Sequence, residues 1–343
     1  MKLKVLNVEK ETSDSISIHF KQPFFNKIKY KPGQFLTLIL DVDGKEVRRA
    51  YSINSTPKID KTVTVTVKRV KDGKVSNRLF EELKPGDTLK VMKPMGNFVF
   101  EAAKGVRRHF VLFGGGSGIT PLMSITKSIL YFEPQSNVSL YYANLNEQSI
   151  IFKRQLKQLE EQFPDRFNLV HILEKPSPNW TGETGRINKD KIAGWINNML
   201  PESADQRAYY ICGPTGMMEV VQNSLYDLDI PEEKIHIESF TAPVKKACGA
   251  ASEHQVAFVL NGKEHKVPVT PNKSILDAVL DEDIKATYSC LSGICGSCKS
   301  KLISGKIKNE EKNILSAEEK EAGYILPCVC FPEDDNVKIE MKS

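Results

Sequence analysis

Residues 290–298 read Cys290-Leu-Ser-Gly-Ile-Cys295-Gly-Ser-Cys298, and a further cysteine, Cys328, follows thirty positions later. A C-x4-C-x2-C run with one distant cysteine is the ligand spacing of a [2Fe–2S] cluster, in which four thiolates hold two irons. Zinc sites usually pair their cysteines as two C-x2–4-C knuckles, and this uneven spacing fits them poorly. The run therefore predicts an iron–sulfur centre that passes one electron at a time.

Three ligands within nine residues need a loop whose backbone folds closely round the sulfurs. The small residues Gly293, Gly296 and Ser297 allow such a fold, and their N–H groups can then point at the cluster. The rest of the chain is expected to show where the electrons come from.

Length and composition indicate an ordinary globular protein of two or three domains. The chain has 343 residues, of which 40% are hydrophobic and 27% charged. A net charge of +5 without a strongly basic block does not indicate nucleic-acid binding. The N-terminal residues lack an apolar signal core, and no stretch approaches 18 uninterrupted apolar residues. We therefore expect no membrane partner and a cytoplasmic location, where the seven cysteines serve as metal ligands and spare thiols.

The first domain, residues 1–103, is predicted to be an antiparallel β-barrel. Apolar and polar residues alternate at residues 16–20 and 63–67, which is the period of half-buried strands. Pro32-Gly33 and Pro85-Gly86-Asp87 mark turns. Strands at such short spacing favour a closed, all-β barrel.

From about His109 the pattern changes to strands that alternate with helices. The predicted strands are the apolar segments 110–113, 139–143, 170–173 and 208–212. Pro121 suits the first turn of a helix, and another helix is expected from Thr215. This alternation predicts a parallel, doubly wound α/β sheet, which we assign to residues 104–243.

The third domain is predicted over residues 254–343, after a small and polar linker at 244–253. Alternating apolar residues lead to Asn261-Gly262, a strong hairpin signal. Ser274 then opens a short helix, with Asp277 placed as the acid of a capping box. A hairpin, a helix and the cysteine loop together predict a small β-grasp fold.

Two segments of the barrel carry groups suited to a flat, phosphorylated cofactor. In Arg49-Ala-Tyr51-Ser52, the arginine can neutralise a phosphate, the tyrosine can stack on a ring, and the serine hydroxyl can reach a ring nitrogen. Strand alternation places Arg49 and Tyr51 on one side and Ser52 on the other. Gly73-Lys-Val-Ser76-Asn77 offers a turn with backbone and hydroxyl donors for a phosphate. Taken alone, the first segment is better explained as an ordinary strand with a surface arginine, and the second is weak evidence by itself.

In the second domain, two glycine segments follow strands. Gly114-Gly-Gly-Ser-Gly118-Ile-Thr-Pro121 leads from a strand into a helix, where N–H groups and the helix dipole favour a pyrophosphate. It departs from the G-x-G-x-x-G fingerprint, because Ile119 stands in the third glycine's place and no acid follows about 20 positions on. Cys212-Gly213-Pro214 ends a strand at the edge where ligands of doubly wound folds bind. By itself, Cys212 also fits a buried inert thiol.

These segments, in this order and followed by the cysteine run, resemble the ferredoxin–NADP reductase superfamily with a C-terminal plant-type ferredoxin domain. The resemblance covers nearly the whole chain and is nearest to reductase components of multicomponent bacterial oxygenases, of the phenylacetyl-CoA epoxidase type. It implies that the barrel binds a flavin and that Arg49, Tyr51 and Ser52 hold the flavin phosphate, ring and N5 edge. It also implies that Gly73 and Ser76 belong to a second flavin-phosphate loop, which favours FAD over FMN.

The resemblance further implies a nicotinamide-nucleotide site. Its pyrophosphate would be lined by Gly114, Gly115, Gly116, Ser117, Gly118 and Thr120. Cys212, with Gly213 and Pro214, would lie near the nicotinamide ring where hydride leaves. Glu238-Ser-Phe240 resembles the acid-x-aromatic ending of the family's nucleotide domain, close to the flavin, although a solvated strand end explains Glu238 equally well. The expected catalytic residues are then Ser52, Cys212 and Glu238.

The fourth cluster ligand is also taken from the resemblance. Cys328 and Cys330 both lie in Leu326-Pro-Cys-Val-Cys-Phe-Pro332. The family's Gly-x-Ile-Leu-x-Cys pattern matches Gly323 to Cys328, although Pro327 takes a place that is usually small. The expected ligands are Cys290, Cys295, Cys298 and Cys328, which leaves Cys330 and Cys248 as structural thiols.

Electron counting predicts the reaction. A reduced nicotinamide gives up two electrons as a hydride, a cluster accepts one, and a flavin between them can do both. We therefore expect an NAD(P)H-dependent reductase that feeds an oxygenase component or another redox protein. The alternatives are a general ferredoxin or cytochrome reductase and a non-catalytic electron carrier or sensor. Asn144 stands where an acid would favour NADH, and Lys153 and Arg154 can meet a 2′-phosphate, so NADPH is slightly favoured.

Overall fold

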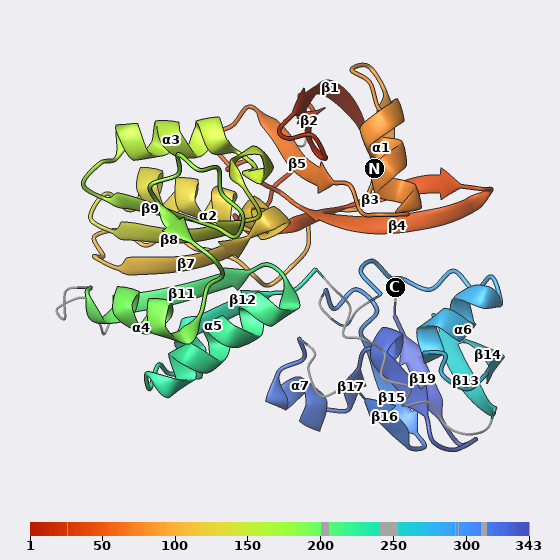
Figure 1. Cartoon of the computed structure of the whole chain (residues 1–343). Coiled ribbons are helices and arrows are strands. Elements are labelled where there is room, and N and C mark those ends of the chain that lie inside the picture. Colours follow the sequence, from red (N-terminus) through yellow and green to blue (C-terminus); the bar gives the residue numbers. More distant parts are fainter. Residues whose placement is uncertain are drawn as a thin grey trace. The chain divides into compact units, whose positions relative to one another are not determined.

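The computed structural model describes residues 1–25, 27–199, 206–240, 253–291, 293, 295–309 and 314–342. The chain divides into two compact units, Met1–Phe240 and Thr241–Ser343 (Figure 1). All of the predicted linker at 244–253 except Glu253 lies outside the described residues, and so does Cys248.

The first unit begins with six antiparallel strands in the order β4-β3-β6-β1-β2-β5. Ile53, directly after β4, bridges Val65 of β5 and so joins the two ends of the sheet. Alternate apolar side chains point inward and are fully buried, as the period of two requires. The predicted antiparallel barrel is therefore confirmed. Its strands are β1 (Lys2–Lys10), β2 (Ser15–Lys21), β3 (Phe35–Val42), β4 (Lys45–Ser52), β5 (Thr62–Lys68) and β6 (Thr88–Val91).

The barrel domain also contains a helix, α1 (Lys74–Glu82), so the expectation of an all-β domain was wrong. Val75 and Leu79 lie four positions apart and are buried in the barrel core. Two apolar residues at this spacing share one face of a helix. The preceding Gly73 resembles a turn residue in the sequence, but it is the residue at which the helix begins.

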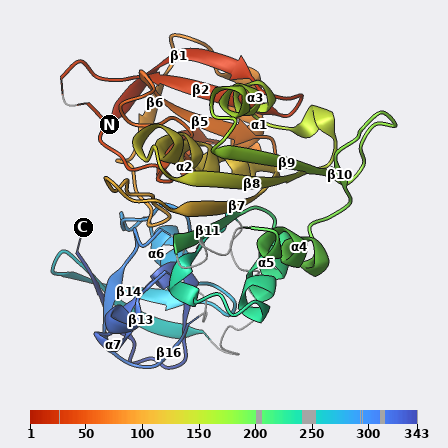
Figure 2. The same ribbon diagram turned by 90° about the vertical axis from the view of Figure 1, so that its left-hand side faces the viewer.

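The second domain is a parallel sheet in the order β10-β9-β8-β7-β11-β12, which confirms the doubly wound prediction. Helices α2 and α3 cover one face, and α4 and α5 cover the other (Figures 1 and 2). The chain order reverses between β7 and β11, and ligands of such sheets bind at this switch point. The strands are β7 (His109–Gly115), β8 (Asn137–Asn144), β9 (Phe167–Leu173), β10 (Glu183–Thr184), β11 (Arg207–Cys212) and β12 (Ile235–Glu238). The helices are α2 (Ile119–Phe132), α3 (Lys153–Gln162), α4 (Lys189–Asn197) and α5 (Thr215–Asp227), with short 3₁₀ turns η1 (Gly116–Gly118), η2 (Glu147–Ser149) and η4 (Glu232–Lys234).

Helix α2 joins the two domains of the first unit. The Ser124 hydroxyl donates to the carbonyl oxygen of Ser55 over 2.6 Å, and the Lys127 ammonium lies 2.6 Å from a carboxylate oxygen of Asp60. Ser55 and Asp60 follow β4 in the barrel. The contacts fix the end of β4 against the parallel sheet, which positions the site described below.

The second unit contains a mixed sheet in the order β14-β13-β19-β15-β17, with β13 and β19 parallel. Asn261 and Gly262 both have positive φ, as the predicted two-residue hairpin turn requires. The Ser274 hydroxyl accepts from the backbone N–H of Asp277 and caps α6. The β-grasp prediction is confirmed. The elements are β13 (His254–Leu260), β14 (Lys263–Val269), α6 (Ile275–Asp281), β15 (Ser300–Ser304), β16 (Ile307–Asn309), α7 (Ala317–Glu321), β17 (Tyr324–Ile325), η5 (Pro327–Val329), β18 (Cys330–Pro332) and β19 (Lys338–Met341).

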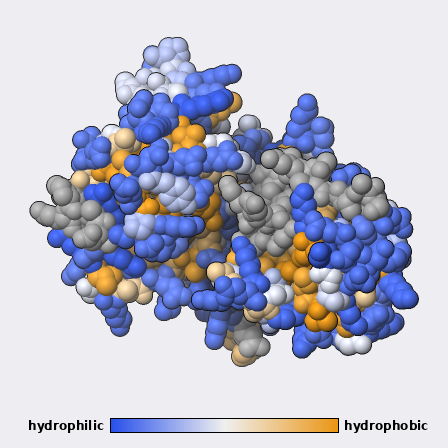
Figure 3. Space-filling model, turned by 90° about the horizontal axis from the view of Figure 1, so that it is seen from below, coloured by the Kyte–Doolittle hydropathy of each residue, from blue (hydrophilic) through white to orange (hydrophobic). Residues whose placement is uncertain are grey.

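The surface seen from below is mostly polar, with apolar residues gathered in separate patches (Figure 3). Among the described residues, no helix combines the length and the apolar character needed to cross a membrane.

Candidate functional site

The three residues expected to be catalytic come together in the first unit from both of its domains. Ser52 ends β4 of the barrel, and its hydroxyl donates to Oε2 of Glu238 over 3.2 Å. Glu238 ends β12, where it lies in register with Cys212 at the end of β11. All three therefore lie at the C-terminal edge of the parallel sheet, beside the switch point.

Burial sets the protonation of this cluster. It raises the pKa of Glu238 to about 8, although the hydrogen bond from Ser52 acts in the opposite direction. Burial, followed by the nearby Glu238 carboxylate, raises the pKa of the Cys212 thiol well above its usual value. Near neutral pH, Glu238 can therefore hold or release a proton, whereas Cys212 stays a thiol.

The side chains of Arg49 and Tyr51 are more exposed than that of Ser52. Arg49 is exposed, and its guanidinium donates to the carbonyl oxygen of Arg48 over 2.8 Å. Tyr51 is half-buried, and burial raises its pKa to about 12, so its phenol stays neutral. Ser52 is only 4% exposed. The end of β4 thus presents a cation and an aromatic face next to the buried hydroxyl.

Gly73 and Ser76 lie at the start of α1 rather than in a free turn. The Ser76 hydroxyl accepts from the N–H of Val70 over 3.1 Å, and the side chain is 7% exposed. A Cβ on Gly73 would lie 2.7 Å from that hydroxyl oxygen. A phosphate here would therefore meet the first N–H groups of the helix, while the Ser76 hydroxyl closes the turn.

The glycine segments of β7 and β11 pack against each other at the switch point. A Cβ on Gly118 would lie 2.0 Å from the carbonyl oxygen of Cys212, and one on Gly115 would lie 2.6 Å from Cδ of Pro214. Side chains at these positions would separate the two strand ends. The segment runs through η1 into α2, and the Thr120 hydroxyl donates to the carbonyl oxygen of Ser117. The backbone N–H groups at the start of α2 therefore follow this turn directly, at the place where the sequence predicts a pyrophosphate.

Lys68, the last residue of β5, was missed by sequence reasoning. A Cβ on Gly116 would lie 4.0 Å from its ammonium nitrogen, which also lies 3.6 Å from a carboxylate oxygen of Asp14. A cation of the barrel therefore stands over the glycine turn of the other domain, where it can meet a pyrophosphate. In the sequence, Lys68 is the polar end of an ordinary alternating strand, and no local signal marks it.

The three residues expected to decide between NADPH and NADH lie in different environments. Asn144 is 8% exposed at the end of β8. Arg154 pairs with Glu9 of the barrel, at 3.2 Å between the charged atoms. Lys153, at the start of α3, makes no ion pair with the described residues. Lys153 is thus the more available of the two cations.

The cysteine loop has the close backbone fold that its spacing demands. Leu291, Gly293 and Gly296 all have φ in the left-handed region. The N–H of Ser297 points at Sγ of Cys295 over 3.4 Å, and the N–H of Gly293 faces Cys328. Ser292 and Ile294 lie outside the described residues. Backbone donors directed at sulfur are what a thiolate-bound cluster requires.

The four expected ligands lie as two pairs of thiols. Sγ of Cys298 is 3.4 Å from Sγ of Cys328, and Cys295 interacts with Cys290. Within each pair, the neighbouring sulfur and burial raise the pKa of Cys295 and Cys328, so these thiols ionise together only when a cation compensates their charge. Among the described residues, no group of three or more His, Cys, Asp or Glu side chains is arranged to hold a single metal ion. This donor set fits two irons, each held by one pair.

Cys330 lies two residues further on, in β18 opposite Asn309, and is fully buried. Cys328 lies in η5 with its sulfur against Cys298. The geometry thus favours Cys328 over Cys330 as the fourth ligand.

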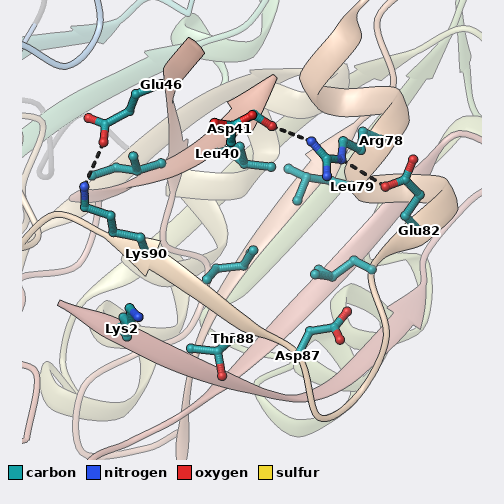
Figure 4. Close-up of a pocket in the computed structure, with 13 residues that line it drawn as sticks. Lys2, Leu40, Asp41, Glu46, Arg78, Leu79, Glu82, Asp87, Thr88 and Lys90 are labelled. Carbon is teal, nitrogen blue, oxygen red and sulfur yellow. Dashed lines mark hydrogen bonds and ion pairs between the residues drawn. The ribbon is translucent and has the colours of Figure 1, made fainter. Parts of the chain in front are cut away.

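A hollow of about 550 Å³ lies on the barrel but contains none of the predicted site residues. Its wall carries ion pairs between Arg78 and Glu82 and between Lys90 and Glu46 (Figure 4). Because these charges neutralise each other, the hollow has no evident preference for an anion or a cation.

Comparison with known proteins agrees with this geometry. The chain matches models of an oxidoreductase FAD-binding domain over residues 2–100, an oxidoreductase NAD-binding domain over 112–223 and a 2Fe-2S iron-sulfur cluster binding domain over 258–333. It is 33% identical to a component of the 1,2-phenylacetyl-CoA epoxidase of Escherichia coli, with 98% of this chain and 96% of that protein covered. It is 37% identical to the ferredoxin reductase component of 3-ketosteroid-9-alpha-monooxygenase of Rhodococcus rhodochrous, and this match also covers 98% of this chain and 96% of that protein.

Among solved structures, phthalate dioxygenase reductase matches with a TM-score of 0.65 at 23% identity, over 99% of this chain and 98% of that one. This likeness supports the three-domain fold. With the chain-long similarity to the two oxygenase components, it shows that the protein belongs to the ferredoxin–NADP reductase superfamily, as an FAD- and nicotinamide-dependent oxidoreductase with a C-terminal [2Fe–2S] ferredoxin domain.

Proposed function

We propose that this protein is the reductase component of a multicomponent oxygenase of the phenylacetyl-CoA epoxidase type, taking electrons from NAD(P)H and delivering them singly to the oxygenase. The observation that carries the proposal is the meeting of Ser52, Cys212 and Glu238 at the switch point, in a chain that also holds a four-thiol cluster loop. The end-to-end similarity to the epoxidase component supports the choice of acceptor. When bound, FAD accepts a hydride and the cluster takes its electrons one at a time.

The residues of the barrel orient the flavin. Arg49 would neutralise a flavin phosphate, Tyr51 would stack on the ring, and the Ser52 hydroxyl would reach its N5 edge. The N-terminus of α1, with Gly73 and Ser76, binds the second phosphate through N–H groups, which is why FAD fits better than FMN. Phe240, two residues after Glu238, adds an apolar surface close to the ring.

The residues of the sheet hold the nicotinamide nucleotide. The Gly114–Gly118 turn and Thr120 line the pyrophosphate, and Lys68 supplies the opposite charge. Cys212, Gly213 and Pro214, which pack closely against the glycine turn, would form the wall beside the nicotinamide. Glu238 accepts the hydrogen bond of the Ser52 hydroxyl, and its raised pKa lets the carboxyl take up or release a proton near neutral pH.

For the second unit, we propose Cys290 and Cys295 as ligands of one iron and Cys298 and Cys328 as ligands of the other. We assign residues 1–103, 104–243 and 254–343 to the flavin, nucleotide and ferredoxin domains, with 244–253 as the linker. A cytoplasmic location follows from thiol ligands that must stay reduced.

We propose NADPH as the preferred donor, because Lys153 at the start of α3 makes no ion pair with the described residues and no acid replaces Asn144. Lys153→Ala should then raise KM for NADPH while leaving KM for NADH unchanged. Lys157→Ala, on the same helix, is the matched control. An equal change for both donors would contradict the assignment.

The function is tested by anaerobic titration of the FAD- and cluster-loaded protein with NADPH and with NADH. Reduction should bleach the flavin absorbance and produce the electron paramagnetic resonance signal of a reduced [2Fe–2S] cluster. Turnover of a phenylacetyl-CoA epoxidase oxygenase, dependent on both components, would support the acceptor. Failure of both nicotinamides to reduce the loaded protein would refute the proposal.

A further inference from the structure

A loop between β2 and β3 exposes the two most solvent-accessible large apolar side chains among the described residues. Phe24 is 87% exposed and Phe25 is 81% exposed. Their rings contact each other edge to face, with centroids 5.0 Å apart. The loop stands out from the barrel, in red beside the N-terminus label in Figure 2. Two adjacent aromatic rings held in water at a loop tip indicate a binding surface rather than a pair of packing residues.

The flanks of the loop are anchored, so the tip is held outward. The side-chain oxygen of Gln22 accepts from the N–H of Ile28 over 3.0 Å, and Ile28 packs in the barrel core. The Tyr30 hydroxyl lies 2.8 Å from the Ser55 hydroxyl. These contacts fix both arms of the loop. Among the described residues, Phe24 and Phe25 belong to none of the apolar clusters, and their rings contact each other.

Along the chain, the charged residues near the tip all carry a positive charge. Between Asp14 and Asp41 the sequence contains no acidic residue, and its four cations are all lysines. Lys21, Lys27 and Lys29 are exposed and make no ion pair with the described residues, whereas Lys31 pairs with Glu101. Three exposed lysines without an ion pair among the described residues thus flank the aromatic pair in the sequence.

This combination fits a lipid surface better than a protein. Protein interfaces are enriched in arginine and depleted in lysine, and they offer hydrogen-bonding groups around their apolar anchors. Lysine side chains extend their ammonium groups to anionic headgroups while neighbouring aromatic rings enter the acyl boundary. Such contact needs no membrane-spanning segment, and a few lysines near an anionic surface each add to binding.

We propose that the exposed side chains between β2 and β3 bind anionic membrane surfaces peripherally, with Phe24 and Phe25 inserted and Lys21, Lys27 and Lys29 on the headgroups. The contact is reversible, because two rings and three cations are fewer than a stable anchor requires. It would hold the reductase near substrates or acceptors that reside in the bilayer. The inference does not depend on which oxygenase the protein serves.

The test is sedimentation of the full, cofactor-loaded chain with vesicles. We expect binding to an equal mixture of phosphatidylglycerol and phosphatidylcholine at low ionic strength, and much weaker binding to phosphatidylcholine alone. A Phe24→Ser/Phe25→Ser variant should bind at least about tenfold more weakly. A Lys27→Glu/Lys29→Glu variant should lose more than about fivefold for each lysine. Leu6→Ser and Lys84→Glu, exposed elsewhere on the barrel, are matched controls that should bind like the wild type.

Reduction of ferricyanide by NAD(P)H should be unchanged in all variants, because none of these residues belongs to the flavin or nucleotide site. No binding of the wild type to anionic vesicles would overturn the proposal, and so would binding that the Phe24→Ser/Phe25→Ser variant retains. If vesicles do not bind but oxygenase turnover falls in that variant, the loop contacts a protein and the lipid assignment is wrong.

Discussion

The raised pKa of Glu238 predicts a specific pH dependence of stability. The carboxyl has a pKa of about 8 in the folded protein and 4.5 when unperturbed, so between these values the folded state binds a proton that the unfolded state does not. Stability that Glu238 contributes is therefore fully present below about pH 4.5 and is lost as the pH rises towards 8. A pKa difference of one unit corresponds to 1.36 kcal/mol, so the free energy of unfolding should fall by at most about 5 kcal/mol over this pH range.

The physical source is the burial of Glu238 against the sheet edge, offset in part by the Ser52 hydroxyl. Glu238→Gln keeps the size and the hydrogen bond but cannot ionise. Its free energy of unfolding should lie slightly below that of the wild type at pH 5 and exceed it at pH 8 and above. Comparison of the two proteins cancels every other titrating group.

The assay is urea unfolding of the flavin-free protein at half-unit steps from about pH 5 to pH 9, followed by tryptophan fluorescence and far-ultraviolet circular dichroism. Glu233→Gln, an exposed carboxyl just before β12, is the matched control and should follow the wild type. If wild type and Glu238→Gln have parallel pH profiles, Glu238 is ionised in the folded protein at neutral pH and the reasoning fails.

Three further predictions concern the cluster, the nucleotide and the fold. Cys328→Ser should lose the visible absorbance of the reconstituted cluster, whereas Cys330→Ser should keep it; the opposite result would exchange their roles. Lys68→Ala should raise KM for both nicotinamides about tenfold with little change in kcat, because a contact to the pyrophosphate is the same in the ground and transition states. Stopped-flow reduction of the flavin measures both constants. A fall in kcat alone would contradict this role of Lys68. Gly118→Ala should destabilise the first unit by several kcal/mol, because its Cβ would lie 2.0 Å from the Cys212 carbonyl oxygen. Gly216→Ala, in open space on α5, should instead stabilise by about 0.5–1 kcal/mol, and equal thermal midpoints for both variants would refute the packing argument.

Much of the fold could be predicted from the sequence because its signals are local. The alternation of β2 and β5, the glycine turn before α2 and the Asn261-Gly262 hairpin each depend on residues within a few positions. The helix α1 was missed because its main apolar anchors are Val75 and Leu79, and a two-residue pattern does not distinguish a helix from a turn. The cysteine spacing was equally local, and it indicated the cluster loop directly.

The sequence by itself determined which chemistry the chain can carry: four thiols at cluster spacing, a glycine turn before a helix, and an Arg-x-Tyr-Ser strand. Only the tertiary structure decided which of these groups meet. Ser52 and Glu238 are 186 positions apart, and Lys68 reaches Gly116 from the other domain. The reason is that the pKa of a group and the affinity of an anion site depend on neighbours in space and on the exclusion of water. Strand pairing brings these distant residues together, and the sequence around each residue does not show with which distant strand it will pair.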